Sequence, residues 1–112
     1  MVKNSKIPER GDIVWIDFSP TKGHEQSGLR PAVVISSLQY NSFSNLVLVC
    51  PMTSKRKNYF FEVPIDGPKG KSFVLADQIR SFDVKERVKI TMGKVSEPEI
   101  NEILARASTL FK

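Results

Sequence analysis

The chain has 112 residues, of which 40% are hydrophobic, so it is long enough to bury the core of one compact domain. It contains no apolar stretch close to the roughly 20 residues that span a bilayer, and no hydrophobic segment follows its basic start, as one would in a signal peptide. A single cysteine excludes an internal disulfide, and a formal net charge of +5 favours polyanionic partners. We therefore expect one domain over residues 1–112, located in the reducing cytoplasm.

Short apolar runs, several of them rich in β-branched residues, predict six strands, at residues 11–18, 32–36, 46–52, 59–63, 72–81 and 88–95. In the first strand Val14, Ile16 and Phe18 would face one way, because strand side chains alternate with a period of two. Ile13 and Trp15 would face the other way. Since both faces are largely apolar, we expect this strand to be covered on both sides.

The segments between these strands are polar. Residues 37–45 are interpreted as a connection that could contain a helical turn, and residues 64–71 as a mobile turn rich in Pro and Gly. Gly93 would mark a bulge in the last strand. The basic run Lys55-Arg56-Lys57 is either a solvated turn or a rim that contacts phosphates, and taken alone it is more typical of the turn.

The end of the chain changes to a helical period. Ser96 and Glu99 have the spacing of a capping box and predict a helix start. The apolar positions that follow form a stripe at helical spacing, which predicts packing against the sheet: Ile100, Ile103, Leu104, Ala107, Leu110 and Phe111. We therefore predict a mainly β protein, a small antiparallel β-barrel closed by a C-terminal helix.

The loop at residues 20–31 carries the clearest sign of chemistry. Gly23 and Gly28 allow it to fold tightly, and Pro31 biases Arg30 toward an extended backbone. The carboxylate of Glu25 and the guanidinium of Arg30 are close in sequence. They form either a solvated surface ion pair, which is worth little, or part of a site for a phosphodiester.

Several chemistries lack the residues they need. His24 is the only histidine, so a paired-histidine mechanism is excluded, and no Cys, His, Asp or Glu cluster has the spacing of metal ligands. No phosphate-binding glycine motif or dinucleotide fingerprint is present. Cys50 lies in an apolar run and is interpreted as a core residue rather than a nucleophile. If the chain is an enzyme, a reaction without metal or cofactor is the simplest expectation.

RNA offers such a reaction, because its 2′-OH can attack the adjacent phosphate. Glu25 is a candidate base, provided that burial raises its pKa. Arg30 can hold the phosphate in a bidentate fork, and Thr53, at the end of a predicted strand, could donate a hydroxyl to the same oxygen.

Four blocks of the sequence, in order, strongly resemble the MazF/PemK family of toxin endoribonucleases: Gly11–Phe18, Pro20–Val34, Pro51–Ser54 and Leu75–Ser81. The resemblance implies an SH3-like barrel that acts as a homodimer, the toxin of a type II toxin–antitoxin system. It implies metal-independent, sequence-specific cleavage of single-stranded mRNA, which leaves a 2′,3′-cyclic phosphate and a 5′-OH. It further implies an antitoxin whose acidic, flexible tail fills the RNA groove. The toxin would contact DNA only indirectly, through this antitoxin.

The resemblance also implies roles for individual residues. Glu25 would be the base, Arg30 the phosphate stabiliser and possible acid, and Thr53 a phosphate-positioning donor. Contacts to RNA are implied for Phe18, Lys22, His24, Gln26, Ser54, Lys55, Lys57, Asp77, Gln78 and Arg80. Some members place an acid arginine where this chain has Leu75, so here Arg30 or solvent would protonate the leaving oxygen, while His24 either assists proton transfer or has no catalytic role.

Two other classes of function remain open. One is a non-catalytic topoisomerase poison like the fold-related CcdB family, although residues 108–112 do not clearly match the C-terminus on which that family relies. The other is an RNA-binding barrel without chemistry, which would not require Glu25, Arg30 and Thr53 together.

Overall fold

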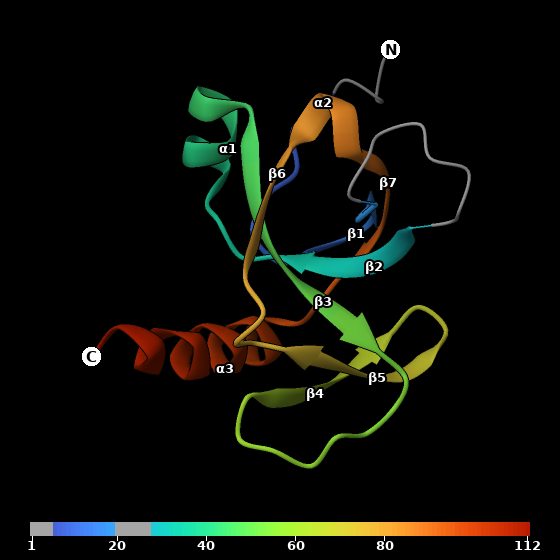
Figure 1. Cartoon of the computed structure of the whole chain (residues 1–112), viewed down its shortest axis with the longest axis vertical. Coiled ribbons are helices and arrows are strands. Elements are labelled where there is room, and N and C mark those ends of the chain that lie inside the picture. The colour runs from blue at the N-terminus through green and yellow to red at the C-terminus, as the bar shows by residue number, and fades with distance from the viewer. Residues whose placement is uncertain (1–5, 20–27) are drawn as a thin grey trace.

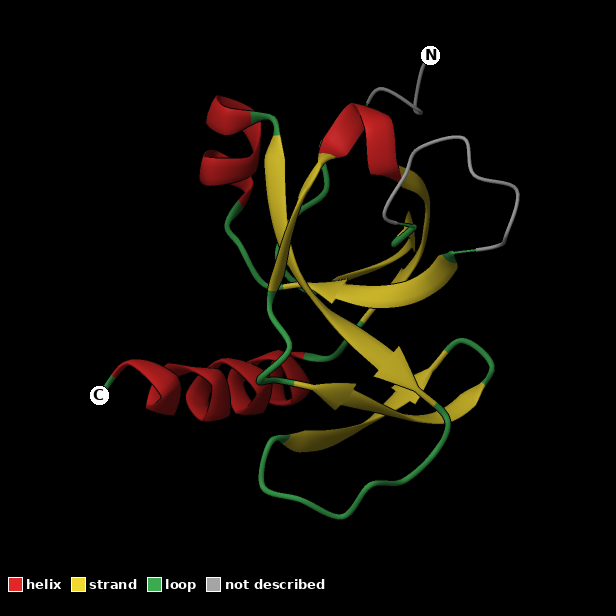
Figure 2. Ribbon diagram, in the orientation of Figure 1, coloured by secondary structure: helices red, strands yellow, loops and turns green. Residues whose placement is uncertain are grey.

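The structure is a computed structural model, and it describes residues 6–19 and 28–112. These residues form a curled β-sheet with helices at its two ends (Figures 1 and 2). In chain order the elements are β1 (Asp12–Asp17), β2 (Leu29–Val34), α1 (Leu38–Ser44), β3 (Leu46–Thr53), β4 (Glu62–Gly67), β5 (Gly70–Leu75), β6 (Arg80–Asp83), α2 (Val84–Arg87), β7 (Val88–Lys94), α3 (Glu97–Ser108) and a final 3-10 turn, Thr109–Phe111. No helix in these ranges is both long and apolar enough to cross a membrane.

Strand β3 organises the sheet. It pairs with β2 along one edge, and along the other edge it pairs first with β6 and then, at its end, with β5. The full order is β4-β5-β3-β2-β1-β7, with β6 joined to β3, and every pair is antiparallel. The sheet curls into a half-barrel beside the C-terminal helix, which confirms the predicted fold class.

The two faces of β1 contribute to two separate cores, as the alternation predicts. Ile13 belongs to a cluster that includes Cys50 and is covered by Ile103 and Ala107 of α3. Val14 and Ile16 belong to a second cluster on the opposite face, completed by residues of β3 and β6. Figure 1 shows α3 beside the β4–β5 hairpin and α1 and α2 at the other end of the molecule.

Cys50 is a core residue, as predicted. It is fully buried, and burial, with a smaller contribution from the charge of Asp77, raises the pKa of its thiol to about 12. A thiol with this pKa is un-ionised at neutral pH and is a poor nucleophile.

The fourth strand was predicted too early in the chain, at residues 59–63. Residues 59–61 form a turn, and β4 covers the region that was predicted to be a mobile turn. β4 and β5 pair up to Gly67 and Gly70, which leaves only Pro68 and Lys69 as the connection. Pro64 has no backbone N–H to donate. It is tolerated inside β4 because this strand lies at the edge of the sheet and pairs with a neighbour on one side only.

The predicted fifth strand was also wrong, because it is two strands. β5 ends at Leu75, and a turn closed by the bond from the Gln78 amide to the Leu75 carbonyl (3.1 Å) separates it from β6. β5 pairs with the end of β3, and after the turn β6 pairs with the beginning of β3. Asp77 and Gln78 therefore lie in a turn and not in a strand.

The helical predictions hold with three differences. Residues 38–44 form a complete short helix, capped by Ser37, rather than a connection with a single turn, and α2 was not predicted. Helix α3 starts with the predicted capping box, but Leu110 and Phe111 are exposed and not part of the core. The α-helix ends at Ser108, and the tighter 3-10 turn rotates the residues after it off the apolar stripe.

Other strand predictions were close. β2 begins at Leu29, three residues before the predicted start, because Trp15 pairs with Pro31 and Ile16 with Arg30. In β7 the pairing with β1 shifts between Gly93 and Thr91, which confirms a bulge beside Gly93.

Candidate nucleic-acid interface

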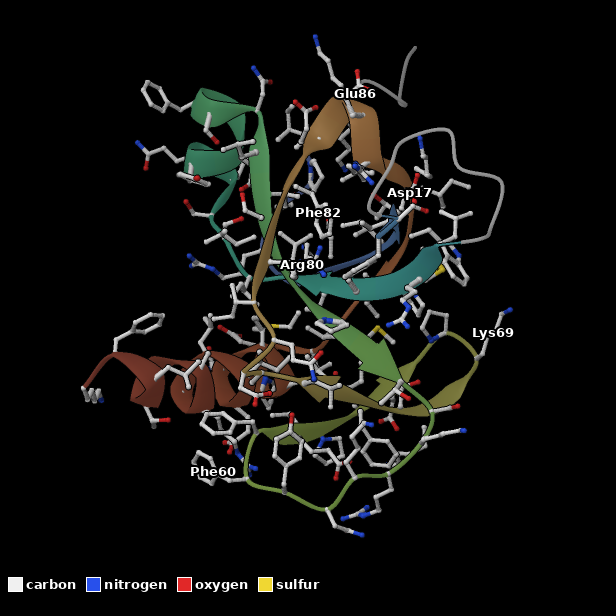
Figure 3. All side chains as sticks on the ribbon, viewed as in Figure 1. Asp17, Phe60, Lys69, Arg80, Phe82 and Glu86 are labelled. Carbon is white, nitrogen blue, oxygen red and sulfur yellow. The ribbon has the colours of Figure 1, made fainter. Side chains whose placement is uncertain are left out.

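Two exposed arginines meet over one phenyl ring. The guanidinium carbons of Arg30 and Arg80 lie 5.9 and 5.5 Å from the centre of the Phe18 ring. Arg80 also lies 5.1 Å from the Phe82 ring, which packs edge-on against Phe18 at 4.9 Å. Figure 3 shows Arg80 and Phe82 close together along β6. A cation over an aromatic face is attracted by the ring, so Phe18 holds two positive charges side by side.

Sheet register explains why these residues share a face. Side chains four residues apart on a strand, and side chains directly paired across strands, point the same way. Arg30 and Val34 therefore lie on the same face of β2. Val34 pairs with Val49 of β3, and Val49 pairs with Arg80 of β6, so Arg80 lies on this face as well. Residues that are fifty positions apart in the sequence are thus brought to one surface by β3.

Thr53 extends the same surface to the end of β3. It lies four residues after Val49, so alternation sets it on the face of Arg30. It is half-buried, and its hydroxyl oxygen accepts a bond from the Lys55 amide (3.1 Å), which leaves its O–H to donate. Thr53 and Ser54 also line a hollow of about 280 Å³ together with Trp15 and Pro31, and alternation along β2 directs Pro31 to the face opposite Arg30.

The basic segment after β3 is held by a buried carboxylate. Glu62 accepts bonds from the backbone amides of Lys57 and Asn58, the second at 3.1 Å, and lies 4.0 Å from the Arg56 guanidinium. The side chains of Lys55 and Lys57 remain exposed. The segment is a turn with a fixed backbone, and its lysines are presented to solvent or to a polyanion.

Asp77 is engaged by a side chain from the turn before β4. Its carboxylate accepts a bond from the Tyr59 hydroxyl (2.5 Å). Burial, together with this bond, raises the pKa of Tyr59 to about 12. Asp77 thus anchors the turn between β5 and β6, while Gln78 in the same turn is exposed.

The remaining predicted site residues lie outside the described ranges: Lys22, His24, Glu25 and Gln26. The two ends of this segment are described and lie close together. The Phe18 amide donates to the Gly28 carbonyl (2.8 Å). A Cβ atom on Gly28 would lie 2.3 Å from the Ser19 hydroxyl oxygen and 2.6 Å from the Ser19 nitrogen, so only glycine allows this approach.

One residue of this region was missed by sequence reasoning. Arg87 donates from Nη1 to the carbonyls of Asp17 (3.1 Å) and Ser19 (2.5 Å). Bonds from Ser19, first its side chain and then its amide, and the charge of Arg87 hold the pKa of Asp17 below its usual value. Because its partners are 70 and 68 positions away, no local pattern could have identified Arg87.

The described ranges contain no group of three or more His, Cys, Asp or Glu side chains placed to hold a metal ion. The arrangement is suited to a phosphodiester, because it combines two planar guanidinium groups, a hydroxyl donor and an aromatic ring on which a base could stack.

Known proteins share both the sequence and this fold. Residues 9–111 match the family described as "PemK-like, MazF-like toxin of type II toxin-antitoxin system". The chain is 40% identical over 105 residues to the endoribonuclease toxin MazF of Escherichia coli K12, which covers 94% of this chain and 95% of that one. It is 34% identical to the endoribonuclease PemK of Escherichia coli over 99% of this chain and 87% of that one. A crystal structure of MazF from Deinococcus radiodurans superposes with a TM-score of 0.79 at 36% identity, covering 94% of this chain and 96% of that one. The chain therefore belongs to the PemK-like, MazF-like toxin family of type II toxin–antitoxin systems.

Proposed function

We propose that the chain is an endoribonuclease toxin that cleaves single-stranded RNA, mRNA in the cell, at specific sequences. The observation that carries the proposal is the pair of exposed guanidinium groups on Phe18. Among the ion pairs within residues 6–19 and 28–112, none involves Arg30 or Arg80, so these charges are not neutralised by a described carboxylate. The relatives named as endoribonucleases support the reaction class.

The reaction uses a nucleophile that the RNA itself carries. The 2′ oxygen bonds to the adjacent phosphorus while the bond to the 5′ oxygen of the next nucleotide breaks. Glu25 takes the 2′ proton, and Arg30 or solvent returns a proton to the leaving oxygen. The products are a 2′,3′-cyclic phosphate and a 5′-OH.

The site residues act on the charge that develops at phosphorus. Negative charge grows on the phosphate oxygens as the pentacoordinate state forms, and the Arg30 fork is suited to bind two of these oxygens. The hydroxyl of Thr53 is a further donor, and preorganised donors of this kind are worth roughly 3 kcal/mol each in the transition state. Arg80, Lys55 and Lys57 serve to bind the backbone of the flanking RNA.

A substrate with one chemical change tests the mechanism. We expect labelled RNA to be cleaved in EDTA, and the same RNA with a single 2′-deoxy substitution at the cut nucleotide to survive. Glu25→Gln should slow cleavage of the normal RNA by on the order of a hundredfold or more, while binding is retained. Cleavage of the deoxy substrate at the normal rate would contradict attack by the 2′-OH, and a fully active Glu25→Gln would exclude Glu25 as the base.

We further propose the partners of the toxin. It acts in the cytoplasm as a homodimer, and a cognate antitoxin fills the RNA groove with an acidic, flexible tail and alone makes contact with DNA. Solved relatives from Deinococcus radiodurans described as MazE–MazF structures support an antitoxin partner. A monomer mass in light scattering at micromolar concentration would contradict the homodimer.

A further inference from the structure

We infer that Arg87 is a positioning residue of the RNA-cleaving site, which fixes the Phe18 ring and through it the two arginines that rest on that ring. The inference rests on the proposed function. Arg87 itself contacts the backbone of the stem at residues 17–19.

The contacts of Arg87 enclose Phe18 on both sides. One nitrogen, Nη1, bonds the carbonyls of Asp17 and Ser19, the residues immediately before and after Phe18, and lies 4.0 Å from the Asp17 carboxylate. The side chains of Arg87 and Asp17 are 19% and 18% exposed, so this contact is largely shielded from water. Shielding makes the charged donor costly to replace by solvent.

Two further contacts make this short stem rigid. The carboxylate of Asp17 accepts a bond from the Ser19 amide (2.9 Å), a local turn around Phe18. The Phe18 amide bonds the Gly28 carbonyl on the neighbouring chain segment. The hydrogen bonds of Arg87 join the stem to α2, which directly follows the strand that carries Arg80 and Phe82.

The site depends on this rigidity because its charges repel one another. Arg30 and Arg80 carry like charges and are exposed, and within the described residues their shared contact is the Phe18 ring. If the stem relaxes, the ring shifts and the two guanidinium groups lose their common support. A displacement of about 1 Å in a site of this kind can cost on the order of a hundredfold in rate.

The experiment compares Arg87→Ala with a matched control, Arg10→Ala. Arg10 also bonds a backbone carbonyl, that of Ile35 (2.9 Å), and its loss changes the net charge equally. We expect Arg87→Ala to lower the single-turnover rate at saturating RNA by about tenfold to a hundredfold, with a smaller change in RNA affinity. Arg10→Ala should remain close to the parent rate, and Arg87→Lys, which can still donate to both carbonyls, should recover part of the loss.

A double-mutant cycle tests whether the effect passes through Phe18. In a Phe18→Leu background, Arg87→Ala should cost little further rate, because the ring that it positions is already absent. Equal losses in both backgrounds would overturn the inference, since Arg87 would then act independently of Phe18.

Amide hydrogen exchange gives a readout that does not depend on activity. Arg87→Ala should speed exchange of the Phe18 amide at least tenfold, while the Ile35 amide, bonded to Leu48, keeps the parent rate. Unchanged Phe18 exchange, or faster exchange with an unchanged cleavage rate, would overturn the inference. A parent protein that cleaves no RNA would instead refute the proposed function. If Arg87→Ala does not fold, Arg87→Gln, which keeps an N–H donor without the charge, is measured in the same way.

Discussion

At the scale of single residues, the shape of Arg30 matters as much as its charge. Its guanidinium lies over the Phe18 ring, and a planar ion both stacks on the ring and presents two parallel donors to a phosphate. Lysine can do neither. We expect Arg30→Ala to lower the cleavage rate by on the order of a hundredfold. Arg30→Lys should recover little of this loss.

The measurement pairs single-turnover cleavage with an RNA binding titration on the same proteins. Lys55→Ala is the comparison, because this exposed lysine offers only a point charge. It should reduce affinity and the salt dependence of binding with little change in the single-turnover rate. A fully active Arg30→Lys would show that the charge alone is sufficient.

A second residue gives a pH dependence of stability. Burial, and then the bond to Asp77, raises the pKa of Tyr59 from 10.0 to about 12. Because the folded state favours the neutral phenol, this contribution to stability is complete below pH 10 and is lost as the pH rises toward about 12. Tyr59→Phe should flatten this alkaline loss of unfolding free energy, measured by urea denaturation across the range. An unchanged pH profile in the variant would assign the loss to other groups.

At the scale of elements, the errors of sequence reasoning have physical causes. The aromatic run at residues 59–61 has high strand propensity. The chain turns there because the buried Glu62 carboxylate binds the backbone amides of Lys57 and Asn58, just before the run. The break between β5 and β6 has no proline or glycine to mark it. It exists because β3 offers two separate stretches of edge to the two strands, and this is a tertiary effect.

The candidate site was predictable only in part for a related reason. Arg30, Thr53 and Arg80 could be identified from sequence blocks, and β3 brings them to one surface. That Asp77 is bonded to Tyr59, and that Arg87 holds the stem beside Phe18, depends on partners far away in the chain. Propensity and periodicity describe near neighbours and carry no information on such pairs.

The stem of the loop gives a prediction at this scale. A methyl group on Gly28 meets the side chain and the backbone nitrogen of Ser19, so Gly28→Ala must open the stem. We expect a loss of about 1 to 3 kcal/mol of unfolding free energy, as in other overpacked sites, together with slower cleavage. Urea denaturation and single-turnover cleavage measure the two effects.

Gly93→Ala is the matched control, because a Cβ atom at Gly93 meets no atom within 4 Å. It should remain close to the parent in both measurements. Adding Ser19→Gly to Gly28→Ala should not restore the parent, because the Ser19 backbone nitrogen would still lie 2.6 Å from the new Cβ atom. Full rescue would show that the serine hydroxyl alone causes the clash.

At the scale of the whole molecule, one curled sheet separates structural from functional surfaces. Both faces of β1 contribute side chains to a core, and α3 covers one of these cores. The guanidinium groups of Arg30 and Arg80 are left at the exposed margin of the other core, beside Phe18. A protein of net charge +5 that presents two arginines in this way is suited to bind an extended polyanion, whether RNA or an acidic peptide.

If the antitoxin tail and RNA occupy one surface, as proposed, inhibition is competitive. We expect the cognate antitoxin, or a synthetic peptide of its acidic tail, to raise the apparent Kd of a non-cleavable 2′-deoxy RNA in proportion to its concentration, without changing the signal at saturation. Arg80→Ala should weaken both ligands because it removes a shared contact. Lys112→Ala, which removes an equal charge at the far end of the C-terminal segment, should weaken neither (Figure 1).

The measurement is a fluorescence binding titration repeated at two salt concentrations, and both affinities should fall with salt because both are electrostatic. An antitoxin that lowered the cleavage rate while leaving RNA affinity intact would show that the two ligands bind different surfaces.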